Sequence, residues 1–177
     1  MTGRGAQRAV GRARSAYARL ATVERALPLV VPGHVRDEVV DHMLRCFPVE
    51  GVGLLATMKS SRKRIAQRFY PGRNIDGSPQ RYTMDPVDVF AALHDMERRR
   101  MRLLAIVHSH PETPPVPSVR DLVEAEVRGV LSVIVGLTPM IDLRAWRFVF
   151  NSHGIATRGE EVRIEEHCDW RRGSKRC

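Results

Sequence analysis

Two histidines and one aspartate have the residue types and spacing of a metal site. His108 and His110 stand at the end of a short, branched apolar run (residues 103–107), which predicts a buried strand. Residues i and i+2 of a strand project to the same face, so the two imidazoles should lie side by side. Asp121 follows in the first turn of a helical segment that Ser118 opens. Two imidazoles and a carboxylate can bind a divalent ion such as zinc and leave the fourth tetrahedral position to water, as in catalytic sites.

Each of these residues also has a purely structural interpretation. His108 could be a core histidine whose hydrogen bonds are satisfied, and Asp121 could cap the helix that follows Ser118. Taken together, however, two histidines on one face would place polar groups at a buried strand end without partners. A metal ion removes that difficulty, so the pattern favours a metal site over separate structural roles.

The segments around this stretch alternate between helical and strand-like patterns. Apolar residues at helical spacing predict a helix over 35–46. Asp85 followed by Pro86 predicts the start of a second helix, which runs to about residue 100. The order predicts an α/β domain with a mixed central sheet flanked by helices. The other predicted elements are a helix over 118–127 and strands over 29–31, 50–56, 65–70, 81–84, 130–137, 143–150, from 155 onward and over 162–166.

The net charge of +9 lies in the two ends of the chain. Residues 1–27 carry six Arg and one Glu, and residues 170–177 carry three Arg and one Lys. Residues 28–169 have 19 basic and 19 acidic side chains, which disfavours nucleic-acid binding by the folded domain. We therefore divide the chain into a basic extension over 1–27 that is partly disordered or forms a short amphipathic helix over 12–27, a folded domain over 28–169, and a basic tail over 170–177.

The cysteine pattern and the apolar runs bear on the cellular compartment. Cys46, Cys168 and Cys177 are odd in number and form no CxxC pair, which favours a reduced cytoplasmic protein. No apolar run approaches the roughly 20 residues of a membrane helix, and no secretory h-region follows the N-terminal arginines. We expect a cytoplasmic protein without a membrane partner.

The stretch His108-Ser109-His110, seven intervening residues, and Ser118-x-x-Asp121 resembles the signature of the JAMM/MPN+ zinc isopeptidases. Residues 48–55 are similar to the P-x-E-x-x-G-L-L segment that precedes the signature in that family, with Glu50 at the acidic position. The spacing of Asn74, Tyr82 and Asp85-Pro86 also resembles short bacterial members. The resemblance covers roughly residues 29–151. It implies a single MPN/JAMM-like domain with a cytidine-deaminase-like mixed sheet.

The resemblance also implies roles for the residues of the signature. His108, His110 and Asp121 would hold one zinc ion with a bound water whose pKa is lowered towards about 7. Glu50 would be the general base and then the general acid, and Ser118 would donate a hydrogen bond to the oxyanion. The choice of Glu50 over the other acidic residues (Glu112, Glu124 and Glu126) rests on the resemblance, not on spacing.

The implied substrate is a ubiquitin-like protein cleaved after its C-terminal glycine, here a β-grasp sulfur carrier. Its Gly-Gly tail could enter a narrow groove as an extended strand. The alternatives are a non-catalytic MPN scaffold, which typically lacks the metal ligands, and binding of nucleic acid or acidic surfaces through residues 1–27 and 170–177. The carrier, the bond type and a homodimeric state stay open.

Overall fold

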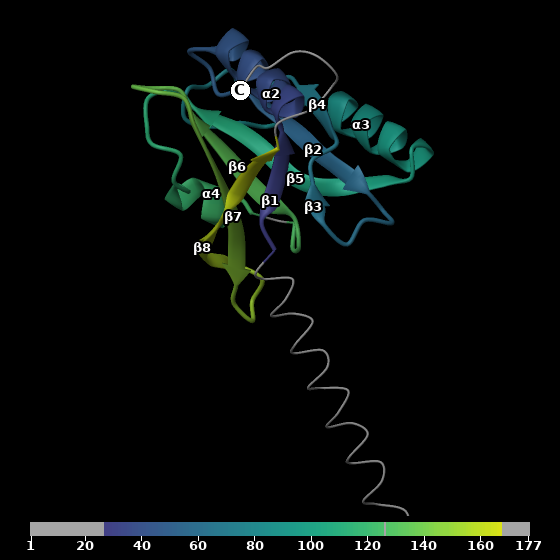
Figure 1. The fold of residues 1–177 in the computed structure, drawn as a ribbon. Coiled ribbons are helices and arrows are strands. Elements are labelled where there is room, and N and C mark those ends of the chain that lie inside the picture. Colours follow the sequence, from purple (N-terminus) through teal and green to yellow (C-terminus); the bar gives the residue numbers. More distant parts are fainter. Residues whose placement is uncertain (1–26, 126, 168–177) are drawn as a thin grey trace, which may run out of the picture.

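The computed structural model describes residues 27–125 and 127–167. A six-stranded mixed sheet forms the centre of the domain (Figure 1). β5 and β6 are parallel, and all other neighbouring pairs in this sheet are antiparallel. In spatial order the strands are β4 (Arg68–Gly72), β2 (Val52–Met58), β5 (Met101–His110), β6 (Leu131–Gly136), β7 (Asp142–Phe150) and β8 (Ala156–Val162).

One face of the sheet packs against helix α2 (Gly33–Cys46) and a small parallel sheet. The small sheet has the order β3 (Arg64–Ile65), β1 (Leu29–Pro32) and β9 (Ile164–His167). The larger hydrophobic core lies between these layers. Buried side chains of α2 and β1 pack against inward-facing residues of the central strands. From α2 these include Val35, Val39 and Met43, and from the central strands Leu55, Val107 and Val133.

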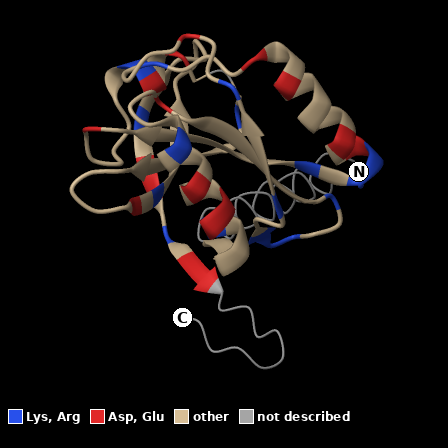
Figure 2. Cartoon of the chain, turned by 90° about the horizontal axis from the view of Figure 1, so that it is seen from above, with Lys and Arg blue, Asp and Glu red and all other residues tan. Residues whose placement is uncertain are grey.

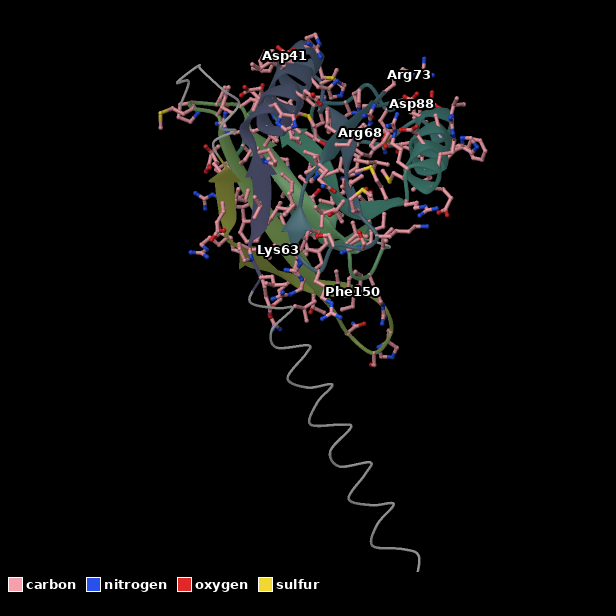
Figure 3. All side chains as sticks on the ribbon, turned by 45° about the vertical axis from the view of Figure 1, so that its right-hand side comes forward. Asp41, Lys63, Arg68, Arg73, Asp88 and Phe150 are labelled. Carbon is pink, nitrogen blue, oxygen red and sulfur yellow. The ribbon has the colours of Figure 1, made fainter. Side chains whose placement is uncertain are left out.

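The opposite face of the sheet carries helix α3 (Pro86–Arg98) and a second core cluster. Leu54 belongs to this cluster and its neighbour Leu55 to the larger one, as expected for a strand with layers on both faces. Pro86 begins α3, and the Asp85 carboxylate accepts a hydrogen bond from the Val87 N–H, which confirms the predicted helix start. Asp88 accepts a hydrogen bond from the Arg73 N–H at 2.9 Å, which ties the preceding loop to the helix (Figure 3).

Three of the predicted elements differ from the structure. Residues 81–84 form no strand beyond a bridge between Met84 and Asn74, because the Asn74 side chain rather than a strand ladder organises this loop. Residues 65–70 divide between β3 and β4, which pair in different sheets. The helix predicted over 118–127 is α4 (Val119–Val123), which is short because none of its apolar side chains is buried.

Acidic and basic residues are interspersed along the described part of the ribbon (Figure 2). This agrees with the balanced charge of residues 28–169. The basic tail and nearly all of the basic extension, with its predicted helix, lie outside the described residues. The described part of the chain contains no helix long and apolar enough to span a membrane.

Candidate metal centre

The end of β5 and the first turn of α4 bring His108, His110 and Asp121 together. The two Nε2 atoms are 3.2 Å apart, and they lie 3.1 and 3.5 Å from the Oδ1 and Oδ2 atoms of Asp121 respectively. The His108 side chain is completely buried, and those of His110 and Asp121 are 6% and 9% exposed. The structure therefore agrees with the prediction that the two imidazoles share one face and meet the carboxylate.

The separations between these donor atoms suit a tetrahedral ion. Donors about 2.0–2.1 Å from zinc at tetrahedral angles lie roughly 3.3–3.4 Å from one another. The two Nε2 atoms are 3.2 Å apart and lie 3.1 and 3.5 Å from the two different oxygens of the Asp121 carboxylate, and one donor atom from each residue lies within 4.8 Å of the others. Two imidazole nitrogens and one carboxylate oxygen are also ligand types that zinc accepts. By donor chemistry and spacing, the residues fit a zinc ion.

Three hydrogen bonds attach the connector between the second histidine and α4, residues 111–117, to strands β5 and β7 and to the loop that follows β6. The Trp146 Nε1–H donates to the Pro115 carbonyl at 3.0 Å, and the Thr138 hydroxyl donates to the Pro111 carbonyl at 2.7 Å. The Nδ1 atom of His110 lies 2.9 Å from the Pro114 carbonyl oxygen. These contacts set the position of the connector and therefore that of α4 with Asp121.

Ser118 and Asp121 form a reciprocal capping box at the start of α4. The Ser118 hydroxyl oxygen accepts from the Asp121 N–H at 3.1 Å, and the Asp121 carboxylate accepts from the Ser118 N–H at 2.6 Å. The predicted cap is confirmed. Because the cap uses the Ser118 hydroxyl group only as an acceptor, the hydroxyl hydrogen stays available to a substrate.

Glu50 lies two residues before β2 and is 5% exposed. Its N–H donates to the Ser78 carbonyl at 3.0 Å, and its carbonyl accepts from the Asn74 amide at 3.0 Å. The next residue, Gly51, donates its N–H to the hydroxyl oxygen of Ser109 at 2.8 Å. Ser109, the residue between the two histidines, thus attaches the Glu50 segment to β5, a role that the sequence did not suggest.

A cleft with a volume of about 690 Å³ lies beside Glu50, His110 and Ser118. Its lining residues come from the segment before β2, the loop before α3, the end of β5, the connector and α4, and they include Glu50, Gln80, His110, Ser118, Val119 and Val123. Two of the alternative acids, Glu112 and Glu124, also line the cleft but are exposed. Glu126 lies outside the described residues. Glu50 is therefore the buried acid among the described candidates.

Burial and mutual hydrogen bonds set the charge states of the site. Although burial opposes its ionisation, hydrogen bonds with both histidines hold the pKa of Asp121 well below its usual range. Burial lowers the pKa of His108. For His110, burial is outweighed by Asp121 and the Pro114 carbonyl, which raise its pKa. Burial raises the pKa of Glu50 to about 7, and the nearby His110 opposes this rise. Neutral His108 and ionised Asp121 are the forms that bind a metal ion.

Comparisons with known proteins agree with this arrangement. The chain is 43% identical over 103 residues to a probable TtuB-protein conjugate cleaving protease of Thermus thermophilus, a match that covers 58% of this chain and 66% of the relative. It is 40% identical over 94 residues to a desampylase of Pyrococcus furiosus, covering 53% and 64% of the two chains. The matches thus span slightly less than two thirds of each relative's length.

A solved structure shares the fold and extends over most of the chain. The protein DSY2949 of Desulfitobacterium hafniense superposes with a TM-score of 0.68 at 26% identity, covering 80% of this chain and 94% of that one. The model of the family described as prokaryotic homologs of the JAB domain matches residues 32–149, which include the whole signature. The chain therefore belongs to the prokaryotic JAB-domain family, as its sequence resemblance to the JAMM/MPN+ proteins predicted.

Proposed function

We propose that the chain is a zinc-dependent peptidase or isopeptidase that hydrolyses the bond after the C-terminal glycine of a ubiquitin-like sulfur-carrier protein. One observation carries the proposal: His108, His110 and Asp121 form a compact donor set, and one of them, His110, lines a cleft together with the buried Glu50 and with Ser118. One relative is named as a probable protease that cleaves TtuB-protein conjugates, and the other is named as a desampylase. Both names support this substrate class.

The reaction divides between the bound ion and the protein's own groups. Zinc held by His108, His110 and Asp121 would supply a Lewis acid and lower the pKa of water towards neutrality. Glu50 takes a proton from the attacking water as the new C–O bond forms at the glycine carbonyl carbon. It then gives that proton to the leaving amine as the C–N bond breaks, so the products are a C-terminal carboxylate and a free amine.

The environment of Glu50 suits this exchange of protons. Burial raises its pKa to about 7, close to the pH at which it would have to accept and release a proton. A cation bound nearby would favour the ionised carboxylate, so Glu50 would begin the reaction as a base. The Ser118 hydroxyl hydrogen, which the capping box does not use, would donate to the substrate oxygen as negative charge develops there.

The cleft supports binding of an extended peptide tail. It is lined by Pro79 and Gln80 of the loop before α3 and, from α4, by Val119 and Val123. A Gly-Gly tail has no side chains to obstruct such a groove, and its backbone can pair with the groove walls as an added strand. The thiol pattern of the sequence supports a cytoplasmic setting for this reaction. The alternative of a non-catalytic scaffold is disfavoured by the complete donor set.

The proposal is tested with Glu50→Gln and a matched surface variant, Glu38→Gln, in which an exposed α2 acid is changed. We expect about one zinc ion per chain in all three proteins, because neither acid is among the proposed ligands. Wild type and Glu38→Gln should cleave a carrier fusion, whereas Glu50→Gln should not. Full activity of Glu50→Gln would refute the proposed base. Absence of zinc from the wild type would refute the metal site and favour the scaffold.

A further inference from the structure

Among the described residues, His108 lacks the hydrogen bond that usually orients a metal ligand. Ligand histidines generally donate their second ring N–H to a carbonyl or carboxylate oxygen, which fixes the ring. His110 follows this rule through the Pro114 carbonyl oxygen, 2.9 Å from its Nδ1 atom. The Nδ1 atom of His108 is buried and has no hydrogen-bond partner among the described residues. Another contact must therefore hold the His108 ring in its orientation.

The Tyr82 ring provides such a contact. It stacks on the imidazole of His108, with the ring centroids 4.6 Å apart and the planes inclined by 27°. The His110 ring lies tilted against the same imidazole at 5.1 Å. Rotation of His108 about its Cβ–Cγ bond would drive the edge of its ring into the face of Tyr82. Packing of this kind fixes the direction of Nε2 without a hydrogen bond.

The position of Tyr82 is itself fixed from both sides by one side chain. The Asn74 amide donates to the carbonyl of Arg81 at 2.9 Å and accepts from the N–H of Thr83 at 3.1 Å, so it binds the backbone on either side of Tyr82. The same amide nitrogen lies 3.0 Å from the Glu50 carbonyl oxygen. Asn74 thus connects the backbone that carries the stacked ring to the backbone of Glu50.

We propose that Tyr82 is a positioning residue for the metal site, and that its ring face takes the place of the hydrogen bond that His108 lacks. The inference rests on the proposed function only in requiring that the donor set bind zinc. The hydroxyl group has no part in it. Burial, followed by the negative charges of Asp121 and Glu50, raises the pKa of Tyr82 well above its usual value, so the ring is uncharged at neutral pH.

The test measures zinc affinity by competition with a chromogenic chelator. Tyr82→Phe keeps the ring face and should bind zinc within about twofold of the wild type. Tyr82→Leu removes the face and should bind about tenfold more weakly or worse, the usual loss when an outer partner of a ligand is removed. The Co²⁺ absorption spectrum should change in Tyr82→Leu and not in Tyr82→Phe, because it reports the geometry of the ligands.

Phe69→Leu is the matched control. Phe69 is buried, and its ring contacts a different histidine, His42, at 5.6 Å. This variant should unfold more easily and keep wild-type zinc affinity. Asn74→Ala, which frees the backbone around Tyr82, should weaken zinc binding and serves as the second variant if Tyr82→Leu does not fold.

The outcomes separate this inference from the proposed function. Wild-type affinity in Tyr82→Leu, or in Asn74→Ala where Tyr82→Leu does not fold, would overturn the inference while the metal site stands. An equal loss in Tyr82→Phe would also overturn it, because the hydroxyl group rather than the ring face would then matter. A wild-type protein that binds no zinc would refute the proposed function itself.

Discussion

We predict that substitution of Glu50 changes how the free energy of unfolding of the metal-free protein depends on pH. Burial raises the pKa of this carboxyl group from an ordinary value of 4.5 to about 7. A tenfold change in proton affinity corresponds to about 1.36 kcal/mol, so the difference between the folded and unfolded chains is worth roughly 3 kcal/mol. Glutamine has nearly the same shape and cannot ionise, which makes Glu50→Gln the direct comparison.

The direction in which the free energy of unfolding changes with pH depends on whether the folded or the unfolded chain holds the Glu50 proton. Between pH 4.5 and about 7 the folded chain keeps the Glu50 proton and the unfolded chain has lost it. The free energy of unfolding therefore has its full value below pH 4.5 and decreases as the pH rises towards 7. Above that pH, the folded protein contains a buried carboxylate that the metal-free site stabilises only partly, through His110.

Urea unfolding in the presence of a chelator, at pH 5 and pH 8, measures this effect. From pH 5 to pH 8, the free energy of unfolding of Glu50→Gln should rise by about 2 to 3 kcal/mol relative to that of the wild type. Glu38→Gln, with an exposed acid changed, should follow the wild type. His110 and Asp121 titrate in all three proteins, so their contributions largely cancel. If the free energy of unfolding changed equally between the two pH values in the wild type and in Glu50→Gln, the Glu50 carboxyl group would not be desolvated. The physical basis of its proposed role would then be lost.

Three further predictions concern the groups around Glu50. Ser118→Ala should lose about 1 kcal/mol of stability with the helix cap, measured by urea unfolding. It should also lower kcat about a hundredfold while its zinc content is unchanged, because the hydroxyl donor is lost; unchanged kcat would refute the donor role. Trp146→Phe removes the hydrogen bond to the buried Pro115 and should lower the free energy of unfolding by about 1–2 kcal/mol, and no loss would show that this bond does not hold the connector. Zinc affinity, measured by chelator competition, should fall up to tenfold per pH unit below the raised pKa of His110, because the ion and the proton compete for this residue; pH-independent affinity would exclude His110 as a ligand.

The donor set was predictable from sequence because its geometry is local. His108 and His110 share a strand face by the two-residue period of a strand, and Asp121 lies close to them in sequence, in the first turn of the helix that Ser118 begins. The contacts of Trp146 and Thr138 that hold this turn against the strand were not predictable from the pattern. Glu50 is different, because it reaches the site through the pairing of β2 with β5 and the contact of Gly51 with Ser109, which are 58 residues apart. Such register depends on the order of strands in the sheet, so only the family resemblance indicated this residue.

The loop that holds Tyr82 shows the limit of periodic patterns. Residues 81–84 alternate as a strand would, yet their backbone groups bind the Asn74 amide instead of a neighbouring strand. One polar side chain that satisfies several backbone groups leaves no periodic signal in the sequence. The capping residue Ser118 correctly predicted where α4 begins, but the apolar residues after it did not predict its end at Val123, because they are exposed rather than buried.

Intact-mass spectrometry of one reaction tests the central claim most directly. The substrate is a β-grasp carrier whose Gly-Gly terminus is followed by a short extension, incubated with the zinc-loaded wild-type protein. We predict a product whose mass ends at the second glycine, and no product after chelation or with Glu50→Gln. An uncut carrier, or cleavage that persists with chelator and with Glu50→Gln, would contradict a zinc-dependent hydrolase that acts through this site.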